Sequence, residues 1–596
     1  MGVNPLINRL REAFSRQELM EHVSELSMMH RIQGSDGIEE AADYIYEALA
    51  DLSSFNVEVR DYSYLASYGN LEPLIGWWVK DAELRMLKPH ERLLHSFNDS
   101  RTLVVAHSPG GDVRAELLYV GPGDRSKYYR GVDVSGKAVL ASGNAYLAYR
   151  EACMRGASAI LLFKNDIPED AVPYIGLFLT PNDMEWAKAV ALSISRKTAN
   201  ELIRHVKNGD KVIISAYVEA GFRDNPRAKV VTARLGDALN EVHLFAHYCH
   251  PGGTVNDNVS GAATLIEVAK ALDRALRKSL IPPLKDYSMV LLWFPEYYGS
   301  QAYLGSRDVS NVVFGINLDM IGEDQGITGS VINFVRPPPS LFHPLESVVY
   351  YGLRDALSRT VSFSSPKRLV SYKFDVVPYE VGSDHDVYIH FGVPSVMINQ
   401  WPDNYYHTDL DTIDKFDPSL AMHIGLAVAS SVYSALIDGV DEHLLSSYVF
   451  EYLGHETSWI DRDIREFRFK YLCKALSTNI VKYCGMQLNR LLQCGEVDIR
   501  GGEGPKYAYR GPLGVIMLRN LIRVLDDADL DELDKLIKEG FMRTVIQSLI
   551  PLLLREPKTL NELKNYLAGE LGVNLSEDVL KKSLDILIKA GFLIQL

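Results

Sequence analysis

The sequence predicts an α/β protein whose central part is a mixed, mostly parallel sheet with helices on both faces. From about residue 228 to 440, apolar strands alternate with helices, the pattern of a sheet that is covered on both sides. Short β-runs with frequent Gly and Pro precede this part, and a largely helical stretch follows it. We therefore expect a β-rich inserted domain and a helical C-terminal region beside the central sheet.

Length and composition indicate a soluble globular protein of several domains. The chain has 596 residues, of which 47% are hydrophobic and 23% charged, and a chain of this length exceeds a single core. The formal net charge of -15 argues against a general nucleic-acid binder, because affinity for phosphate needs a basic surface. No uninterrupted apolar run approaches the ~20 residues of a membrane span. We expect neither a nucleic-acid nor a membrane partner.

The start of the chain and the spacing of the cysteines predict the cellular compartment of the protein. Residues 1–14 contain no apolar core of signal-peptide length. The cysteines are few and lack the paired spacing of a zinc ribbon or a disulfide framework. They are Cys153, Cys249, Cys473, Cys484 and Cys494. We expect an unexported protein in the reducing cytoplasm, and whether it forms a homo-oligomer stays open.

Residues 1–61 predict the N-terminal part of the central domain, and residues 62–225 predict the inserted domain. Gly37–Leu52 has the spacing of an amphipathic helix, and a half-buried strand follows at Val57–Tyr64. Expected strands of the inserted domain are Thr102–Ala106, Ala115–Val120, Lys137–Ala141, Ala159–Phe163 and Val212–Val218. The run Gly131-Val-Asp-Val-Ser-Gly-Lys-Ala-Val-Leu-Ala-Ser, followed by a helix and Arg155-Gly-Ala-Ser-Ala-Ile-Leu-Leu-Phe, resembles the protease-associated domain family.

Residues 226–440 predict the central sheet itself. Expected strands are Lys229–Ala233, Glu241–His247, Ser288–Phe294, Val312–Asp319, Ser330–Phe334 and Ser395–Asn399, and expected helices are Ala262–Leu276, Pro344–Leu357 and Leu420–Ile437. Strand ends that open into polar turns are where α/β proteins hold their reactive groups. We therefore expect the polar residues after these strands to converge.

The rest of the chain predicts helices. Residues 441–544 have a helical pattern without metal-ligand spacing. Residues 545–596 predict helices at Val545–Leu554, Leu560–Leu571 and Glu577–Ala590, then a short strand from Phe592. The Thr559-Leu-x-x-Leu start, the helix opened by Ser576 and the final Gly591 resemble a winged-helix module. Its acids and bases nearly balance, which favours packing or protein contact over DNA binding.

Five polar residues at strand ends or in the following turns are the candidate metal ligands. They are His247, Asp257, Glu296, Asp319 and His407. A single histidine at a strand end is more often a core residue, and Asn256 and Asn258 beside Asp257 suit a turn. A carboxylate at the mouth of a buried strand is costly unless it is paired or metal-bound. His and carboxylate ligands suit zinc, and a shared carboxylate is the usual core of a two-metal hydrolase.

The motifs that carry these residues resemble the M28 family of zinc aminopeptidases and carboxypeptidases. In order they are H-Y-C-H-P…N-D-N-V-S-G, F-P-E-Y-Y-G-S, N-L-D-M-I-G, G-S-D-H and Y-Y-H-T-D-L-D-T. The resemblance implies a zinc exopeptidase fold and a pair of zinc ions. It makes His247 and Asp319 ligands of the first ion, His407 a ligand of the second, and Asp257 the bridge. It also implies that Tyr406 donates a hydrogen bond to the developing oxyanion.

The sequence departs from the family pattern at the glutamates. The family usually has two adjacent glutamates, a base and a ligand, whereas Glu296 here stands between Pro295 and Tyr297. We assign Glu296 as the base, and the ligand role stays open for it. In that case Glu380 or Glu323 is the alternative base.

Three further positions leave alternatives. Cys249 stands where the family has an aspartate that supports the ligand, and a buried free thiol is its commoner role. His250 is an alternative to His247 as the ligand. His385 matches the family's S-D-H motif and either lines the substrate pocket or makes a cap or hydrogen bond.

The sequence thus predicts a metal-dependent exopeptidase acting on peptides, most simply an aminopeptidase. A carboxypeptidase or another amide hydrolase of the same fold is the alternative among enzymes. A non-catalytic receptor or scaffold is the alternative outside them, because the domain layout resembles the glutamate carboxypeptidase and transferrin-receptor branch. The missing second glutamate supports that alternative, and the four retained ligands His247, Asp257, Asp319 and His407 argue against it.

Overall fold

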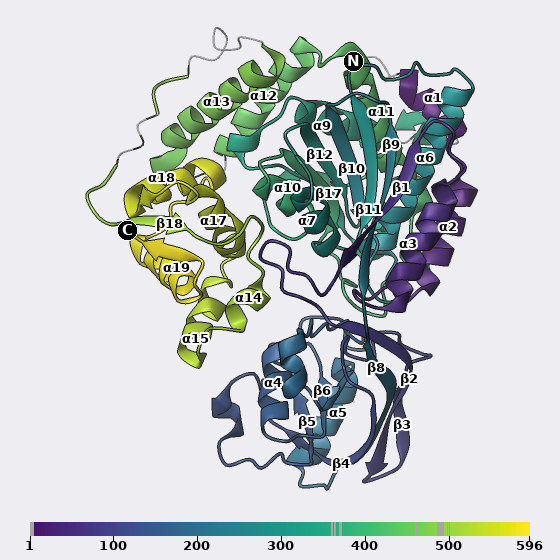
Figure 1. The fold of residues 1–596 in the computed structure, drawn as a ribbon, viewed down its shortest axis with the longest axis vertical. Helices are drawn as coiled ribbons and strands as arrows, with labels where there is room; N and C mark the ends of the chain where they lie inside the picture. Colours follow the sequence, from purple (N-terminus) through teal and green to yellow (C-terminus); the bar gives the residue numbers. More distant parts are fainter. Residues whose placement is uncertain are drawn as a thin grey trace.

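Three bodies make up the protein in a computed structural model (Figure 1). The structure describes residues 5–358, 361–362, 365–368, 372–458, 460, 462–485, 494–497, 499 and 501–596. An eight-stranded sheet with its helices forms the largest body, a seven-stranded sheet forms the second, and helices around a three-stranded sheet form the C-terminal one.

The eight-stranded sheet is mixed, with parallel strands at its centre. Its strands in spatial order are β1 (Asn56–Ser63), β9 (Arg227–Leu235), β11 (Ser288–Phe294), β10 (Glu241–His247), β12 (Val312–Leu318), β17 (Ser395–Trp401), β13 (Val331–Val335) and β16 (Phe374–Val377). The four strands β11, β10, β12 and β17 pair in parallel, as do β13 and β16. The expected strands of the central sheet are confirmed to within a few residues.

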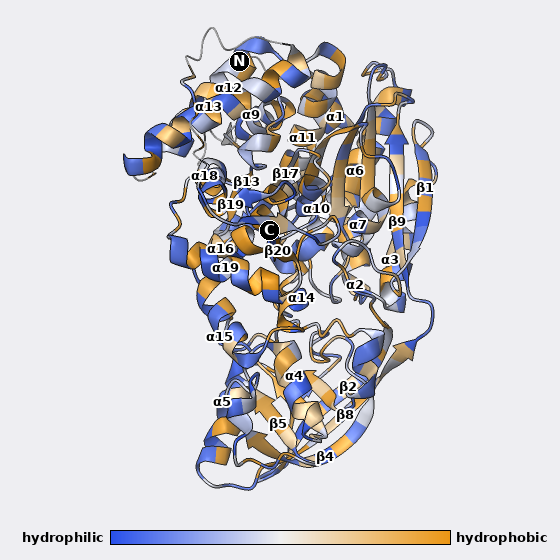
Figure 2. Cartoon of the chain, turned by 60° about the vertical axis from the view of Figure 1, so that its left-hand side comes forward, coloured by the Kyte–Doolittle hydropathy of each residue, from blue (hydrophilic) through white to orange (hydrophobic). Residues whose placement is uncertain are grey.

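Helices cover both faces of this sheet, as predicted. One face packs against α1 (Pro5–Ala13), α2 (Arg16–Met28), α3 (Asp36–Leu49), α6 (Gly261–Arg277), α9 (Leu345–Ser358) and α11 (Pro418–Asp438). The other face packs against α7 (Tyr298–Gly305) and α10 (His385–His390). Strand β10 contributes side chains to the hydrophobic cores on both faces of the sheet. Leu244 points into one core, and its neighbour Phe245 points into the other. Figure 2 shows the hydrophobic residues on the inner elements and the hydrophilic ones on the edge strand β1.

Helix α11 is long and apolar enough to cross a membrane by length and composition, and it is the one such helix among the described residues. It packs against α9, α1 and α6, and 72% of its most apolar window is buried inside the protein. The core helix of a globular domain meets the same test, and the packing of α11 assigns it to the core.

The inserted body is a seven-stranded sheet with two flanking helices. Its strands in spatial order are β3 (Arg92–Ser96), β2 (Gly76–Lys88), β8 (Ile213–Arg223), β4 (Gly111–Tyr119), β5 (Ala138–Ala141), β6 (Ala159–Leu162) and β7 (Val190–Ser193), and its helices are α4 (Ala145–Met154) and α5 (Arg196–Lys207). The predicted strand Thr102–Ala106 is wrong, because this segment makes only isolated bridges from Val104 to Leu192 and from Ala106 to Gly176. Its side chains are buried, and burial alone produced the apolar run that suggested a strand.

The sheet of the C-terminal body begins earlier in the chain than the sequence pattern predicted. Helices α12 (Glu442–Ser458) and α13 (Arg462–Cys484) are followed by strand β18 (Lys506–Tyr509), which lies in the stretch expected to be helical. It pairs with β19 (Lys558–Thr559) and β20 (Leu593–Gln595). The remaining elements are α14 (Leu518–Ile522), α15 (Asp527–Leu536), α16 (Met542–Thr544), a π-helical turn (Val545–Leu549), α17 (Ile550–Leu553), α18 (Leu560–Leu571) and α19 (Glu577–Lys589). A strand of four residues that pairs with distant partners leaves little local signal.

Two of the five cysteines form a disulfide that their spacing did not indicate. Cys473 in α13 is bonded to Cys494, across 21 residues of sequence. Cys153, Cys249 and Cys484 are free thiols. The pairing depends on the chain after α13 returning beside that helix, which a count of cysteines does not reveal.

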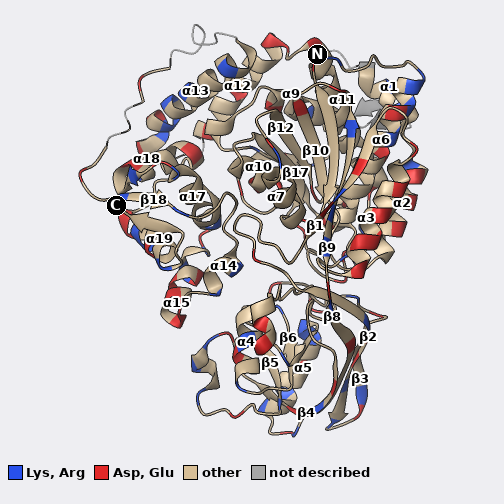
Figure 3. Ribbon diagram, in the orientation of Figure 1, with Lys and Arg blue, Asp and Glu red and all other residues tan. Residues whose placement is uncertain are grey.

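The distribution of charge agrees with the acidic composition. Figure 3 shows several acidic residues, in red, along α2 and α3. A buried charge cluster instead joins the large body to the C-terminal one. Glu456 of α12 accepts hydrogen bonds from Arg336 Nη1 at 2.8 Å and from Arg468 Nη2 at 3.0 Å, and all three side chains are buried. Arg468 also donates to the carbonyl of Gly569 in α18.

Replacing Glu456 by Gln is expected to lower the free energy of unfolding by about 3–5 kcal/mol, because Arg468 loses its buried counter-ion and Arg336 keeps only Glu346. Burial raises the pKa of Glu456, but His455 and the two arginines outweigh it and hold the pKa at about 2. The stabilisation is therefore present above pH ~4.5 and is lost as pH falls towards 2. Denaturant unfolding at several pH values measures both effects. Glu451→Gln, an exposed change on the same helix, should cost less than about 1 kcal/mol; equal losses in the two variants would contradict the prediction.

Candidate metal centre

The parallel register of the central strands brings the predicted ligands together. His247 is the last residue of β10, Asp319 follows β12, and Glu296 follows β11 after Pro295. Strand β10 lies between β11 and β12 and is parallel to both. Their carboxyl ends therefore meet at one edge of the sheet, where the loop that carries His407 also arrives.

Asp257 stands at the middle of this group, in a π-helical turn (Asn256–Ser260) before α6. On one side, His247 Nε2 lies 3.4 Å from Asp257 Oδ1 and 3.2 Å from Asp319 Oδ1. On the other, His250 Nδ1 lies 3.5 Å from Asp257 Oδ1, and His407 Nε2 lies 3.0 Å from Asp257 Oδ2. The ligand atoms of each triad lie within 4.8 Å of one another. We call His247, Asp257 and Asp319 the first triad and His250, Asp257 and His407 the second.

The chemistry of the two triads fits a pair of zinc ions. Each triad offers histidine nitrogen and carboxylate oxygen, which are zinc ligands, and leaves a position for water or substrate. His250 Nδ1 and His407 Nε2 are buried and make no hydrogen bond within the described residues. A buried nitrogen without a partner is costly, and a cation would satisfy it. His247 and His250 each contribute to one of these two triads, so the geometry allows both histidines to be ligands.

Cys249 lies beside the first triad and forms a third candidate ligand group with His247 and His250. Its Sγ is 3.5 Å from Nδ1 of His247, the ring nitrogen that faces away from Asp257 and Asp319. The amide of Glu296 donates to the same sulfur at 3.4 Å. Cys249 is buried, and burial raises the pKa of its thiol. The contact suits a residue that orients the imidazole, a role that outer partners of metal ligands commonly have.

Tyr297 occupies the place of the family's second glutamate and turns away from the triads. Its hydroxyl donates to Asp386 Oδ2 at 2.9 Å, and its amide donates to Asp384 Oδ1 at 2.7 Å. His250 instead lies on the side of the second triad. A nitrogen of His250 is thus available on the side of the centre where the family pattern leads us to expect the carboxylate of a second glutamate.

Glu296 is half-buried between the triads and the cavities around them. Its Oε2 lies 3.9 Å from His250 Nε2. Burial raises the pKa of Glu296 well above its ordinary value; His247 opposes this shift, and the charges of Asp384 and Asp257 add to it. Such a group accepts and returns a proton more readily near neutral pH than an exposed glutamate does.

The alternative bases and His385 have different surroundings. Glu323 is buried away from the centre and interacts with Asp403, and burial followed by that neighbour raises its pKa to about 8. Glu380 lines a cavity at the centre, and its carboxylate makes no hydrogen bond or ion pair within the described residues. His385 does not line that cavity, because its side chain is buried and its Nε2 lies 2.9 Å from the carbonyl oxygen of Glu380.

Tyr406 is held against the second triad by its neighbours. Its ring stacks on His407 with a centroid distance of 3.8 Å and meets Trp401 edge-on at 5.2 Å. The hydroxyl makes no hydrogen bond to a described residue, and Tyr406 lines the same cavity as Glu380. A phenol with a free hydroxyl beside the triads can donate to an oxyanion there.

Residues that the sequence did not point to hold the Asp257 turn. The carboxylate of Asp411 accepts from the amides of Asn256 at 2.8 Å and Asp257 at 3.1 Å. Buried Arg31 donates to the carbonyl oxygens of Tyr248 at 2.8 Å and Thr254 at 3.2 Å. Asp411 lies in the quoted Y-Y-H-T-D-L-D-T motif, which was the one available signal for it. Arg31 lies in the N-terminal segment and gave none.

Two cavities flank the centre, and both include Glu296. The first, of about 460 Å³, is lined by the first triad, Glu380, Tyr406 and residues 540, 543 and 544 of the C-terminal body. The second, of about 380 Å³, is lined by His250, His407 and residues of the inserted domain. We call them the first cavity and the second cavity. Both sizes are those of ligand pockets, and each combines residues of two bodies.

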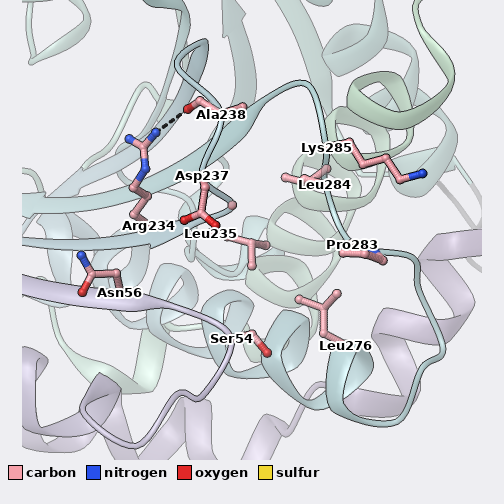
Figure 4. Close-up of a pocket in the computed structure, with 11 residues that line it drawn as sticks. Ser54, Asn56, Arg234, Leu235, Asp237, Ala238, Leu276, Pro283, Leu284 and Lys285 are labelled. Carbon is pink, nitrogen blue, oxygen red and sulfur yellow. Dashed lines mark hydrogen bonds between the residues drawn. The ribbon is translucent and has the colours of Figure 1, made fainter.

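A further cavity of about 580 Å³ lies apart from this centre, between β1, β9 and the end of α6 (Figure 4). None of the predicted site residues lines it. Its Arg234 is already paired, with Glu241 and with the carbonyl of Ala238. This cavity therefore offers no comparable set of reactive groups.

Comparison with known proteins relates the central domain to a peptidase family and to a known fold. Residues 230–432 match the model of peptidase family M28. A peptidase M28 precursor from Shewanella amazonensis has a similar fold, with a TM-score of 0.53, 15% identity, and coverage of 73% of this chain and 96% of that one. No curated protein sequence matches this chain. The central domain thus matches peptidase family M28 over residues 230–432, and its fold is similar to that of the Shewanella protein.

Two aminopeptidases of known structure are more distant in shape. The aminopeptidase from Aneurinibacillus sp. strain AM-1 is 20% identical, with a TM-score of 0.45 and coverage of 72% of this chain and 96% of its own. The zinc aminopeptidase from Bacillus subtilis is 18% identical, with a TM-score of 0.49 and coverage of 71% and 95%.

Removing the His250 side chain tests whether the second triad binds metal. We expect the reconstituted protein to hold about two zinc ions per chain and His250→Ala to hold about one, because the second triad loses a ligand. Elemental analysis after chelator treatment and zinc loading measures this. His443→Ala, a change of an exposed histidine, should retain the full content. Unchanged zinc in His250→Ala would exclude this histidine as a ligand.

Proposed function

We propose that this protein is a zinc-dependent exopeptidase whose two ions share Asp257. The observation that carries the proposal is the meeting of two largely buried ligand triads at one carboxylate, with Glu296 beside both. Zinc bound there supplies a Lewis acid for the carbonyl and lowers the pKa of water. The family match over residues 230–432 supports peptide as the substrate.

Two side chains of the protein carry out the remaining steps, which are proton transfer and stabilisation of the oxyanion. Glu296 takes the proton of the attacking water and returns it to the leaving amine, for which its raised pKa is suited. Tyr406 donates its free hydroxyl to the oxyanion that forms on the carbonyl. The stacking of Tyr406 on His407 fixes the direction of that hydroxyl before the substrate binds.

Glu296→Gln is expected to lower kcat by a factor of about 10³ or more while zinc content stays at the wild-type level, because Gln keeps the shape but accepts no proton. Turnover of amino-acid arylamides and elemental analysis of the same sample measure the two quantities. Glu47→Gln, an exposed change on α3, serves as the control. Loss of zinc from Glu296→Gln would instead make Glu296 a ligand.

The position of Glu380 favours hydrolysis of a peptide from its free amino end, which is aminopeptidase activity. The side chain of Glu380 is exposed and lines the first cavity, and its carboxylate makes no hydrogen bond or ion pair among the described residues; partial desolvation raises its pKa, and the charge of His385 opposes this. The ammonium group of a peptide is a cation of suitable size for it. Val335, Val377, Val381 and Met397 line the same cavity and suit an apolar side chain next to that ammonium.

Glu380→Gln should raise KM for leucine arylamide about tenfold with a smaller change in kcat, because a charge-assisted hydrogen bond to the ammonium is lost. N-acetylated leucine arylamide should not be hydrolysed by either protein. Hydrolysis confined to N-blocked peptides with free carboxyl ends would overturn the choice of an aminopeptidase and favour a carboxypeptidase.

The outer bodies fit the same proposal. We infer that residues 62–225 form a protease-associated-like domain and residues 545–596 a winged-helix-like module. The seven-stranded sheet with its two helices supports the first assignment; strands β19 and β20 with α18 and α19 support the second, to which β18 from outside the range adds a strand. In this proposal both bodies contribute walls to the substrate cavities. The retained residues His247, Asp257, Asp319 and His407 also argue against a receptor that has lost its metals.

A further inference from the structure

The second cavity joins the metal centre to the inserted domain. From the peptidase domain it is lined by His250, Glu296 and His407, and from the inserted domain by Lys164 and Tyr174. The ring of Tyr174 meets those of His250 and His407 edge-on, at centroid distances of 5.5 and 5.2 Å. The amide of Tyr174 donates to the carbonyl of His407 at 2.7 Å. The inserted domain is thus fixed against the second triad.

Lys164 is the basic group of this cavity and lacks a partner. It follows β6 and is half-buried, and its ammonium makes no hydrogen bond or salt bridge with any residue that the structure describes. Burial lowers its pKa, and the nearby charge of Asp166 only partly opposes this. By contrast, Lys137 and Lys197 of the same domain pair with Glu116 and Asp170, at 2.6 and 2.8 Å.

A partly desolvated ammonium without a counter-ion is unfavourable unless a ligand supplies an anion. We propose that Lys164 binds a carboxylate of the peptide substrate in the second cavity. This inference rests on the proposed function and extends it to the substrate. Glu380 lies in the first cavity and Lys164 in the second, with Glu296 lining both. A short peptide places its ammonium at Glu380 and its terminal carboxylate at Lys164, so the substrate class is peptides of a few residues.

Binding tests this inference without relying on turnover. Leucyl-alanine and leucyl-alanine amide are titrated by calorimetry into zinc-loaded Glu296→Gln protein, in which hydrolysis does not interfere. We expect the free acid to bind about tenfold more tightly than the amide, the effect of a hydrogen bond to a charged group. Lys164→Met in this background should remove the preference, and Lys164→Arg should retain it. Lys211→Met, an exposed change in the same domain, is the matched control and should also retain it.

A third peptide identifies the source of the carboxylate. Leucyl-isoglutamine carries its only carboxylate on a side chain. If leucyl-isoglutamine binds more tightly than leucyl-alanine amide and this preference requires Lys164, the lysine binds the carboxylate of an acidic side chain. If only the preference for leucyl-alanine requires Lys164, the lysine binds the terminal carboxylate of the peptide. Equal affinity for acid and amide, no binding of either, or a preference that survives Lys164→Met would overturn the inference. Hydrolysis of leucine arylamide by the wild-type protein tests the proposed function separately.

Discussion

The sharing of Asp257 between two triads is the constraint on which the centre depends. A buried carboxylate within 3.5 Å of three histidines is stable only if its backbone cannot move and its charge is satisfied. Asp411 fixes the backbone through two amides. Asn258 fixes the neighbouring strand end, since it accepts from the amide of Met320 and donates to the carbonyl of Leu318. Asp257 and Asp319 are therefore held in one rigid unit.

Four residues in or next to the two triads have unusual backbone conformations. His250, Tyr297, Met320 and His407 have positive φ angles, of 99°, 59°, 59° and 52°. Positive φ is unfavourable for residues with a side chain and persists where surrounding contacts determine it. Each of the four is a triad residue or directly follows Glu296 or Asp319. At His250 this conformation directs the ring back towards Asp257, so that one short loop supplies ligands to both triads.

The sequence carried enough information for the sheet and for the ligands, because both follow from periodicity and from the ends of strands. His247, Asp257, Asp319 and His407 meet as expected. The inclusion of both His247 and His250 could not be predicted, because it depends on the backbone angle at His250. The contacts of Arg31 and the bond between Cys473 and Cys494 link segments far apart in sequence. Strand β18 likewise exists only through its pairing with distant strands.

The histidine at the second triad changes the charge of the centre. The family pattern supplies a second glutamate, whereas this chain supplies neutral His250 and turns Tyr297 towards Asp386. If two divalent ions occupied the triads as proposed, they would be less completely neutralised with one negative charge fewer. Such a centre would attract anionic groups more strongly. The same excess of positive charge would draw a substrate carboxylate to the side of the second triad, where Lys164 lies.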